Sequence, residues 1–215
     1  MDAIEFENKF WSFYINLEEE FLEIEKIIPY DKLNKNTFSY KFMGLLLSIC
    51  SEMDFIFKMF IESKDNSFSK RNLDDYRRFI ECYYQDFKNS EVTGYKNRFT
   101  DLRCQPFKYW SCGDAPKWWQ VYNKIKHDRI KLKEDEKEWY LCANQKNVLN
   151  ALGALFILNM YFYRECVDLE KECEVPLPQS KIFNLENWGN YRSNLIGNNY
   201  YLNSDTLVLH YNELP

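Results

Sequence analysis

The chain contains few of the residues that build metal centres. Its 215 residues include two histidines, His127 and His210, which lie far apart in the sequence. The seven cysteines are odd in number and widely scattered, with no C-x-x-C pair among them. Structural zinc sites and disulfide frameworks normally show closely spaced ligands. We therefore expect no metal site and no cofactor, and we expect the cysteines to be reduced thiols, mostly buried as small apolar residues.

Long apolar runs are also absent. The longest apolar stretch, Val148 to Tyr163, falls short of the ~20 residues that a membrane crossing needs, and it contains Asn150 and Asn159. The N-terminal sequence MDAIEFENKF carries acids where a secretory signal has a basic start, and it has no apolar region of its own. We therefore expect a cytoplasmic protein without membrane association, and we expect residues 148–163 to form a core helix.

Aromatic residues, in contrast, are abundant. They make up 18% of the chain, which is far more than a disordered chain contains and indicates a packed interior. A chain of this length can bury a core that stabilises it without disulfides or metals. We expect one domain, in which residues 1–172 form a helical bundle and residues 173–215 form an extension packed on it.

Charge is unevenly distributed along the sequence. The net charge of −5 argues against non-specific nucleic-acid binding by the whole surface. Residues 1–31 contain nine acids against two lysines, and five of them, Glu18, Glu19, Glu20, Glu23 and Glu25, are most simply the solvated face of a helix. Residues 117–133 have Asp128 as their one acid against six bases: Lys117, Lys124, Lys126, Arg129, Lys131 and Lys133. This asymmetry predicts a dipolar protein, or a dimer in which the acidic and basic surfaces meet.

Large apolar residues recur at steps of three or four in several long segments, which places them on one face of a helix. The first helix is predicted over residues 6–28, where Pro29 stops it. The second is predicted over residues 38–60, with Thr37 or Asn36 as its N-cap.

Two further helices follow the same spacing. The third is predicted over residues 73–87 after the N-cap Asn72, with Asp74 and Arg78 as a supporting i, i+4 pair. The last is predicted over residues 144–172, and it is apolar around so much of its circumference that we expect it at the centre of the bundle.

The remaining segments are less regular. Residues 89–116 lose the helical period and predict a long aromatic connection that wraps the bundle. A shorter helix is predicted from Ala115 to Lys131, with Asp114 as N-cap and Pro116 in the first turn. Residues 199–203 and 206–211 alternate as two short strands. The predicted fold is therefore mainly all-α, an antiparallel bundle of four to five long helices with a small C-terminal β-hairpin.

The segment from Trp118 to Arg129 carries the one chemical signal of the sequence. On a helix, Asn123 and His127 are four residues apart and share a face, with basic residues around them. One interpretation is structural: Asn123 or a backbone carbonyl satisfies His127, and the lysines form a solvated face. The other is that the segment binds a phosphate-containing ligand.

The run Y-N-x-x-K-H-x-R, Tyr122 to Arg129, resembles the HEPN superfamily of helical bundles from prokaryotic toxins and abortive-infection systems, as does the N-V-L-N-A-L run of the later helix. Many of these proteins are metal-independent ribonucleases with an Arg, often followed by Asn, four to six residues before a His. Asn123 and His127 match that pattern, and Tyr122 stands where the family has its Arg. Arg129, Lys126, Arg98 or Arg103 are the candidates to replace it.

The resemblance implies an RNA-directed protein of bacterial stress or phage defence. It implies His127, Arg129 and Asn123 as catalytic residues, with His127 as the general acid or base, because histidine titrates near neutral pH. It also implies that Lys124, Lys126, Tyr122 and Lys131 contact RNA. Glu52 either orients His127 or points to solvent.

The implied partners are RNA, a second copy of the chain in a homodimer, and an antitoxin or another protein. Two other functions remain open. A non-catalytic bundle would use Trp118, Trp119 and the basic helix as an interaction or dimerisation surface. Alternatively, the chain is a helical accessory protein to a nucleotide-handling enzyme.

Overall fold

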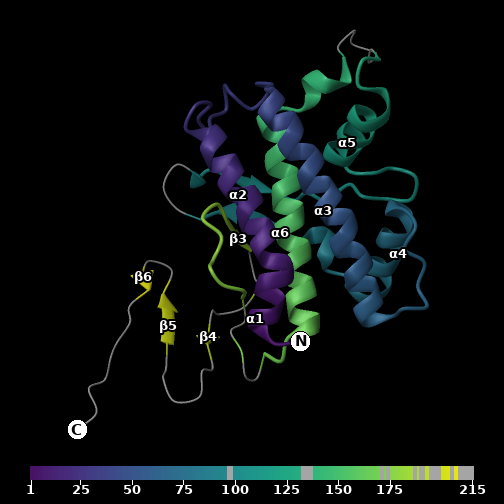
Figure 1. The fold of residues 1–215 in the computed structure, drawn as a ribbon, viewed down its shortest axis with the longest axis vertical. Coiled ribbons are helices and arrows are strands. Elements are labelled where there is room, and N and C mark those ends of the chain that lie inside the picture. The colour runs from purple at the N-terminus through teal and green to yellow at the C-terminus, as the bar shows by residue number, and fades with distance from the viewer. Residues whose placement is uncertain are drawn as a thin grey trace.

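The computed structural model describes residues 1–95, 99–131, 138–169, 172, 175–185, 188, 192–193, 200–203 and 206–207, with side chains as far as Trp188. Over these residues the chain is mainly helical, with a small antiparallel sheet (Figure 1). The prediction of a mainly helical fold is therefore confirmed. None of the helices in this part of the chain combines the length and apolar composition needed to span a membrane.

The N-terminal helical segment is continuous from residue 3 to residue 25. α1 (Ala3–Phe6) passes through a π-helical stretch, η1 (Glu7–Trp11), into α2 (Ser12–Glu25). The helix predicted over residues 6–28 is thus present, but it begins and ends three residues earlier. The fully buried Glu25 accepts the backbone N–H of Tyr30 at 3.1 Å, which ties the turn around Pro29 to the end of α2.

The second helix, α3 (Tyr40–Lys64), begins later than its sequence pattern suggests. Its N-cap is Ser39, whose hydroxyl accepts the N–H of Phe42 at 3.0 Å. The prediction of Thr37 or Asn36 as N-cap is wrong. Phe38 forms an antiparallel bridge with Asn144, and this pairing holds the chain before Ser39 out of the helix.

The third helix, α4 (Leu73–Tyr83), begins at the predicted N-cap, because the Asn72 side chain accepts the N–H groups of Asp74 and Asp75. The predicted Asp74–Arg78 ion pair is also present, at 3.1 Å. The helix ends before Phe87, which instead begins a short 3₁₀ helix, η2 (Phe87–Asn89).

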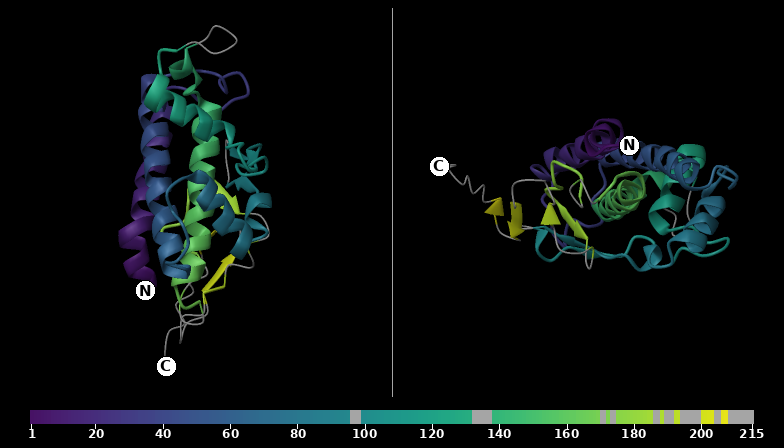
Figure 2. Two further views of the ribbon diagram at one scale, coloured as in Figure 1. Left: turned by 90° about the vertical axis from the view of Figure 1, so that its right-hand side faces the viewer. Right: turned by 90° about the horizontal axis from the view of Figure 1, so that it is seen from below.

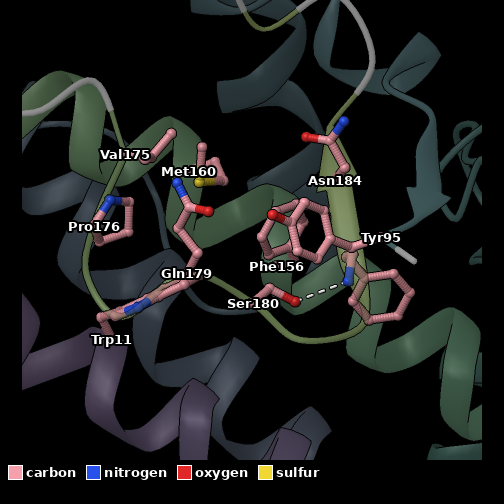
Figure 3. A pocket seen from close by; sticks show the side chains of 10 residues that line it. Trp11, Tyr95, Phe156, Met160, Val175, Pro176, Gln179, Ser180 and Asn184 are labelled. Atoms are coloured by element: carbon pink, nitrogen blue, oxygen red, sulfur yellow. Dashed lines mark hydrogen bonds between the residues drawn. The ribbon is translucent and has the colours of Figure 1, made fainter. Parts of the chain in front are cut away.

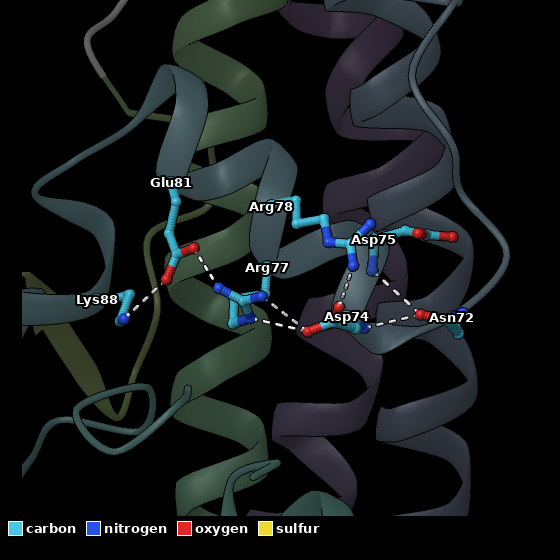
Figure 4. A network of polar contacts seen from close by, with 7 residues as sticks. All are labelled: Asn72, Asp74, Asp75, Arg77, Arg78, Glu81 and Lys88. Carbon is cyan, nitrogen blue, oxygen red and sulfur yellow. Dashed lines mark hydrogen bonds and ion pairs between the residues drawn. The ribbon is translucent and has the colours of Figure 1, made fainter. Parts of the chain in front are cut away.

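A ladder of ion pairs covers one side of α4 (Figure 4). Arg77 lies between Asp74, at 2.9 Å, and Glu81. Lys88, beyond the end of the helix, approaches Glu81 at 3.0 Å. Pairs at this spacing support a short helix whose intrinsic stability in water is marginal.

The last long helix, α6 (Gln145–Cys166), begins at the N-cap Asn144 and lies at the centre of the molecule. Every residue from 151 to 160 is buried, so the predicted central position is confirmed. It ends at Cys166 rather than at residue 172, because Val167 has extended backbone angles.

The central helices α3 and α6 run in the same direction. The bridge between Phe38 and Asn144 joins the residues just before both helices, and Lys64 pairs with Glu165 at 2.9 Å where both end. The N-terminal ammonium donates to the carbonyl of Cys166 at 3.2 Å, so α1 and α2 run opposite to α6 (Figures 1 and 2). The antiparallel order predicted for the bundle is therefore wrong for its central pair.

The predicted irregular connection, residues 89–116, contains two strands that the sequence pattern did not reveal. β1 (Val92–Gly94) pairs antiparallel with β2 (Arg103–Cys104) and with β3 (Phe183–Leu185), in the order β2-β1-β3. The sheet packs on α6 at Gly153, where an added Cβ would lie 3.1 Å from Cγ2 of Val92. A glycine here allows the strand to approach the helix closely.

The segment around β3 is part of the same hydrophobic core as the helices. Trp11 donates its indole N–H to the carbonyl of Pro178 at 2.7 Å, and Phe183 packs against Phe156. Figure 3 shows Trp11 and Phe156 around a pocket that Val175 and Pro176 also line. Val175 and Leu185 are also buried in this core. A domain boundary at residue 172 stays a prediction, although the chain beyond it clearly packs on the helices as far as Leu185.

The C-terminal strands are β4 (Arg192–Ser193), β5 (Tyr200–Asn203) and β6 (Thr206–Leu207). β5 and β6 pair antiparallel, with Leu202 opposite Leu207 and Asn203 opposite Thr206. The predicted β-hairpin is confirmed over these residues. Its turn and the predicted continuation over residues 208–211 lie outside the described part of the chain, as does His210.

Candidate functional site

Helix α5 (Lys117–Asp128) carries the predicted site, and one of its faces anchors it in the core. That face consists of five buried residues: Trp118, Trp119, Val121, Tyr122 and Ile125. The helix was predicted from Ala115 to Lys131 with Asp114 as N-cap, but Pro116 occupies the N-cap position. Asp114 instead accepts from the side chain of Gln120 at 2.9 Å. Burial of this face fixes how the opposite face is presented.

The two tryptophans are core residues. Trp118 is 3% exposed and donates its indole N–H to the carbonyl of Pro106 at 3.0 Å, while Trp119 is 6% exposed. Their predicted role as anchors of an interaction surface is therefore wrong in this structure. The loop around Pro106 covers the ring of Trp118. Because consecutive helix residues lie about 100° apart around the axis, Trp119 points in another direction, and it is buried there too.

The opposite face of α5 is polar and open to solvent. From Asn123 onward, its exposed polar residues, with those just after the helix, are Asn123, Lys124, Lys126, His127, Arg129 and Lys131, and the apolar Ile130 is exposed among them. The structure therefore brings together six of the seven predicted site residues on one surface. The seventh, Tyr122, is 8% exposed, and the ammonium of Lys126 lies over its ring at 5.6 Å. Tyr122 thus positions Lys126 and offers little surface to a ligand.

Asp128 is the acid that partly neutralises this face. Lys131 approaches its carboxylate at 2.6 Å and Lys124 at 3.5 Å. The hydrogen bond and charge of Lys131, followed by the hydrogen bond and charge of Lys124, lower the pKa of Asp128 below its usual value. Lys124 and Lys131 are therefore partly neutralised by Asp128. Lys126 and Arg129, in contrast, have no ion pair among the residues that the structure describes.

His127 is exposed and makes no hydrogen bond within the described residues. In particular, no hydrogen bond joins it to Asn123, although the two share a helical face as predicted. The structural interpretation, in which Asn123 satisfies His127, is therefore wrong. The exposed imidazole is accessible to a ligand on this face of α5.

Glu52 does not orient His127. It lies on α3 and lines a groove against α2, and its Oε1 atom is buried without a hydrogen-bond partner. Burial raises the pKa of Glu52 above its usual value. The alternative, a carboxylate simply pointing to solvent, is also wrong, because the groove half-buries this side chain.

Of the other candidates to hold phosphate, Arg103 lies on β2 and approaches Glu91 at 3.9 Å. It lies in the sheet and does not join the α5 surface. Arg98 falls outside the described residues.

A groove of about 490 Å³ runs along α5 and brings in residues that sequence analysis did not select. Asn123 and Lys126 line it from α5, Lys58 from α3, and Arg71 from the segment before α4. Lys58 pairs with Asp54 at 2.5 Å, whereas Arg71 has no ion pair within the described residues. No local pattern marks Arg71, because only the tertiary arrangement of α3, α4 and α5 brings it to this groove.

The acidic and basic segments lie on different surfaces. The glutamates Glu19, Glu20 and Glu23 line a groove of about 920 Å³ between α2 and α3, which α5 does not line. The predicted separation of charge is therefore present. Among the described residues, no three His, Cys, Asp or Glu side chains lie close enough to hold a metal ion.

Comparison of the chain with models of known protein families, with curated proteins and with solved structures finds no match.

Proposed function

We propose that this chain is an RNA-directed protein that contacts the phosphate backbone through the exposed face of α5. One observation carries the proposal: six polar or basic residues lie together on the exposed face of a helix whose other face is locked in the core. Lys126 and Arg129 supply charge that no described acid neutralises. Lysine and arginine on a fixed surface bind phosphates and supply most of the affinity for nucleic acid.

Arg71 extends this proposed surface into the groove beside α5. It faces the same groove as Lys126, so a strand crossing α5 meets two cations without ion pairs among the described residues. Three carboxylates line the groove, and one of them, Asp114, accepts from the amide of Gln120. The other two are paired with cations: Asp54 accepts from Lys58 and Tyr76, and Asp74 from Arg77 and Arg78. Their repulsion of a phosphate is correspondingly reduced.

The catalytic form of the proposal is metal-independent RNA cleavage. The 2′-oxygen attacks the adjacent phosphorus, the bond from phosphorus to the 5′-oxygen breaks, and a cyclic phosphate remains. One base must take the 2′ proton and one acid must protonate the leaving oxygen. His127 fits either role and Arg129 would stabilise the added negative charge. Since one chain offers a single histidine here, a symmetric dimer would supply both groups.

The resemblance of Asn123 and His127 to the HEPN pattern adds the proposed setting, bacterial stress or phage defence, with an antitoxin or another protein as partner. Tyr122 stands where that family has its Arg, and it is largely buried. We therefore propose Arg129 as the residue that takes over the role of that Arg.

The test is binding of a labelled single-stranded oligoribonucleotide, followed by fluorescence anisotropy over a salt series. We expect Lys126→Glu and Arg129→Glu each to weaken binding and to reduce the slope of log K against log salt by about 0.7 for each lost phosphate contact. Lys9→Glu, an exposed lysine on the N-terminal helix, is the matched control and should bind like the parent protein. Equal affinities for all four proteins would overturn the proposal.

A second candidate function is protein–protein interaction through the groove between α2 and α3. It is favoured by two exposed aromatic residues, Phe13 at 57% and Phe55 at 46%, near the acidic groove. If that groove receives the basic face of a second copy, the dimer should weaken as salt rises, because exposed charges are screened within about 10 Å at 0.1 M. Sedimentation velocity at low and high salt measures this, and an unchanged dimer would exclude the electrostatic contact.

A further inference from the structure

A partly exposed aromatic cluster lies at the end of the molecule where α3 and α6 begin. Tyr40 is the first residue of α3 and is 71% exposed. Tyr140 belongs to η4 (Trp139–Cys142), the short 3₁₀ helix that precedes α6. The two rings are parallel within 5°, with centroids 6.4 Å apart. Phe38 supports both at 5.2 and 5.3 Å, with its ring nearly perpendicular to each.

This arrangement holds the two tyrosine rings in place from beneath. Phe38 is fixed by its bridge to Asn144, and both helices are capped beside it, α3 by Ser39 and α6 by Asn144. The rings of Tyr40 and, in part, Tyr140 therefore present parallel aromatic faces at the surface. They form a ready surface for another flat ring.

The cluster lies directly beside the end of α5. Tyr140 donates its backbone N–H to the carbonyl of Arg129, and Trp139 donates to that of Lys131, both at 3.3 Å. The ammonium of Lys124 lies 6.0 Å from the Trp139 ring. Figure 1 shows the end of α5 and the first turns of α3 and α6 together at one end of the molecule. The proposed phosphate-binding face and the aromatic cluster are therefore neighbours.

The surroundings of the cluster are mainly basic, although the Tyr140 hydroxyl is hydrogen-bonded to the carboxylate of Glu138. Lys41 follows Tyr40, and the main chains of Lys35 and Lys146 are joined by a hydrogen bond of 3.0 Å next to the bridge. These three exposed lysines have no ion pair among the described residues. The parallel direction of α3 and α6 also places two positive helix ends here, which adds to the potential that attracts an anionic strand.

We propose that Tyr40 and Tyr140 form a stacking site for unpaired bases, so that the substrate class is single-stranded RNA. The inference rests on the proposed function, because α5 supplies the backbone contacts. Aromatic side chains beside a basic surface are how proteins hold single strands without reading sequence. In a duplex the base faces are stacked on one another and cannot reach the tyrosines. The rim of lysines disfavours an ordinary apolar protein partner.

The test compares three labelled RNA ligands of equal length: a single strand, its duplex, and a single strand of abasic ribose phosphate. The variants are Tyr40→Ala, Tyr40→Phe and, as a matched control, Tyr109→Ala, whose ring is 77% exposed outside the cluster. Tyr40→Ala should weaken binding of the base-containing strand by roughly 5- to 150-fold. Its affinity for the abasic strand should match that of the parent protein. Tyr40→Phe should retain most of the affinity, and Tyr109→Ala all of it.

The outcomes separate this inference from the function on which it rests. If Tyr40→Ala binds the base-containing strand like the parent protein while Lys126→Glu binds it less tightly, the stacking site is excluded and the α5 interface stands. Tighter binding of the duplex than of the single strand would also exclude it. If the parent protein binds none of the three ligands, both proposals fail.

Discussion

Glu18 of α2 accepts a hydrogen bond from the backbone N–H of Lys181 at 2.7 Å, across 163 residues of sequence. The carboxylate is 1% exposed and also accepts from the hydroxyls of Tyr14 and Ser180. No ion pair to it is present within the described residues, so its charge is balanced by these donors and by the backbone N–H of Ile182 at 3.4 Å. This cluster attaches the segment before β3 to the first helix.

Removing the Glu18 carboxylate should destabilise the protein. Glu18→Ala leaves several buried donors without an acceptor, and we expect the free energy of unfolding to fall by about 2–4 kcal/mol. Glu18→Gln keeps one acceptor oxygen, so its free energy of unfolding should fall by less than that of Glu18→Ala. Urea unfolding followed by circular dichroism measures both. Glu19→Ala, whose side chain is 49% exposed, is the control, and a loss as large as that of Glu18→Ala would contradict this account.

Alkaline pH should destabilise the protein through buried acids that stay protonated in the fold. Burial, followed by the charge of Glu18, raises the pKa of Tyr14 well above 10.0, and burial raises the pKa of Cys50 well above 9.0 and that of Cys104 to about 12. The unfolded chain releases these protons at the ordinary values, so it binds fewer protons than the native state above pH 9.0. Stability is therefore fully present below that pH and falls as pH rises toward the folded-state pKa values.

Chemical denaturation at a series of pH values checks this expectation. Tyr14→Phe removes one of the buried titrating groups, so the loss of stability with rising pH should be smaller in this variant. Its stability near neutral pH should be lower than that of the parent protein, because Glu18 loses a hydrogen-bond donor. A stability that is constant, or that rises with pH in the alkaline range, is the result that this mechanism does not allow.

Two glycines should respond in opposite directions to the same substitution. Gly44, in the interior of α3, is exposed, and an added Cβ would meet nothing within 4 Å. Gly44→Ala should therefore stabilise the protein by about 0.5–1 kcal/mol, because alanine loses less backbone entropy in a helix. In β1, a Cβ at Gly94 would lie 1.7 Å from the carbonyl oxygen of Phe99. Gly94→Ala should lower the free energy of unfolding by about 1–3 kcal/mol, because the backbone of Gly94 or Phe99 must move to make room for the Cβ.

Thermal unfolding of the two variants provides the comparison. Gly44→Ala should raise the midpoint and Gly94→Ala should lower it. If Gly94→Ala melts like the parent protein, the close approach between β1 and Phe99 is not present in solution.

His127→Ala should separate catalysis from folding. If the chain cleaves RNA, loss of a general acid or base should lower the rate by about 10²–10⁴-fold. The melting temperature should remain unchanged, because His127 is exposed and makes no hydrogen bond within the described residues. Arg129→Ala should also slow cleavage. The assay uses total RNA with and without EDTA, near neutral pH, and Lys9→Glu is again the control.

A parent protein without nuclease activity, together with intact RNA binding, would reduce the proposal to an RNA-binding protein. A large loss of stability in His127→Ala would instead make His127 a packing residue and contradict its exposed position.

Short-range pattern determined much of the secondary structure. Steps of three and four along one face predict α2, α3, α4 and α6 because a helix contacts its neighbours at those intervals. Asn72 was recognisable as an N-cap because its side chain bonds N–H groups two and three residues ahead. Likewise, the all-round apolar character of residues 151–160 indicated a central helix, since such a segment is stable only when it is covered on every side.

The sequence also grouped the exposed residues of α5, because positions along one helix have a fixed angular relationship. It could not show which face the core would cover. Trp118 and Trp119 are buried and His127 is exposed because α5 packs against α3, α6 and the loop at Pro106, and each of these is distant in sequence. The same holds for Arg71, which joins the groove only through the tertiary arrangement of α3, α4 and α5.

Only the tertiary structure decided the direction of the central helices and the aromatic cluster at their start. The chain between α3 and α6 is long enough to return to the beginning of α3, so no local signal requires an antiparallel pair. Phe38 is extended because it pairs with Asn144, and this moves the N-cap of α3 to Ser39. Tyr40 and Tyr140, a hundred residues apart in sequence, meet for the same reason: long-range pairing outweighs local preference where the two compete.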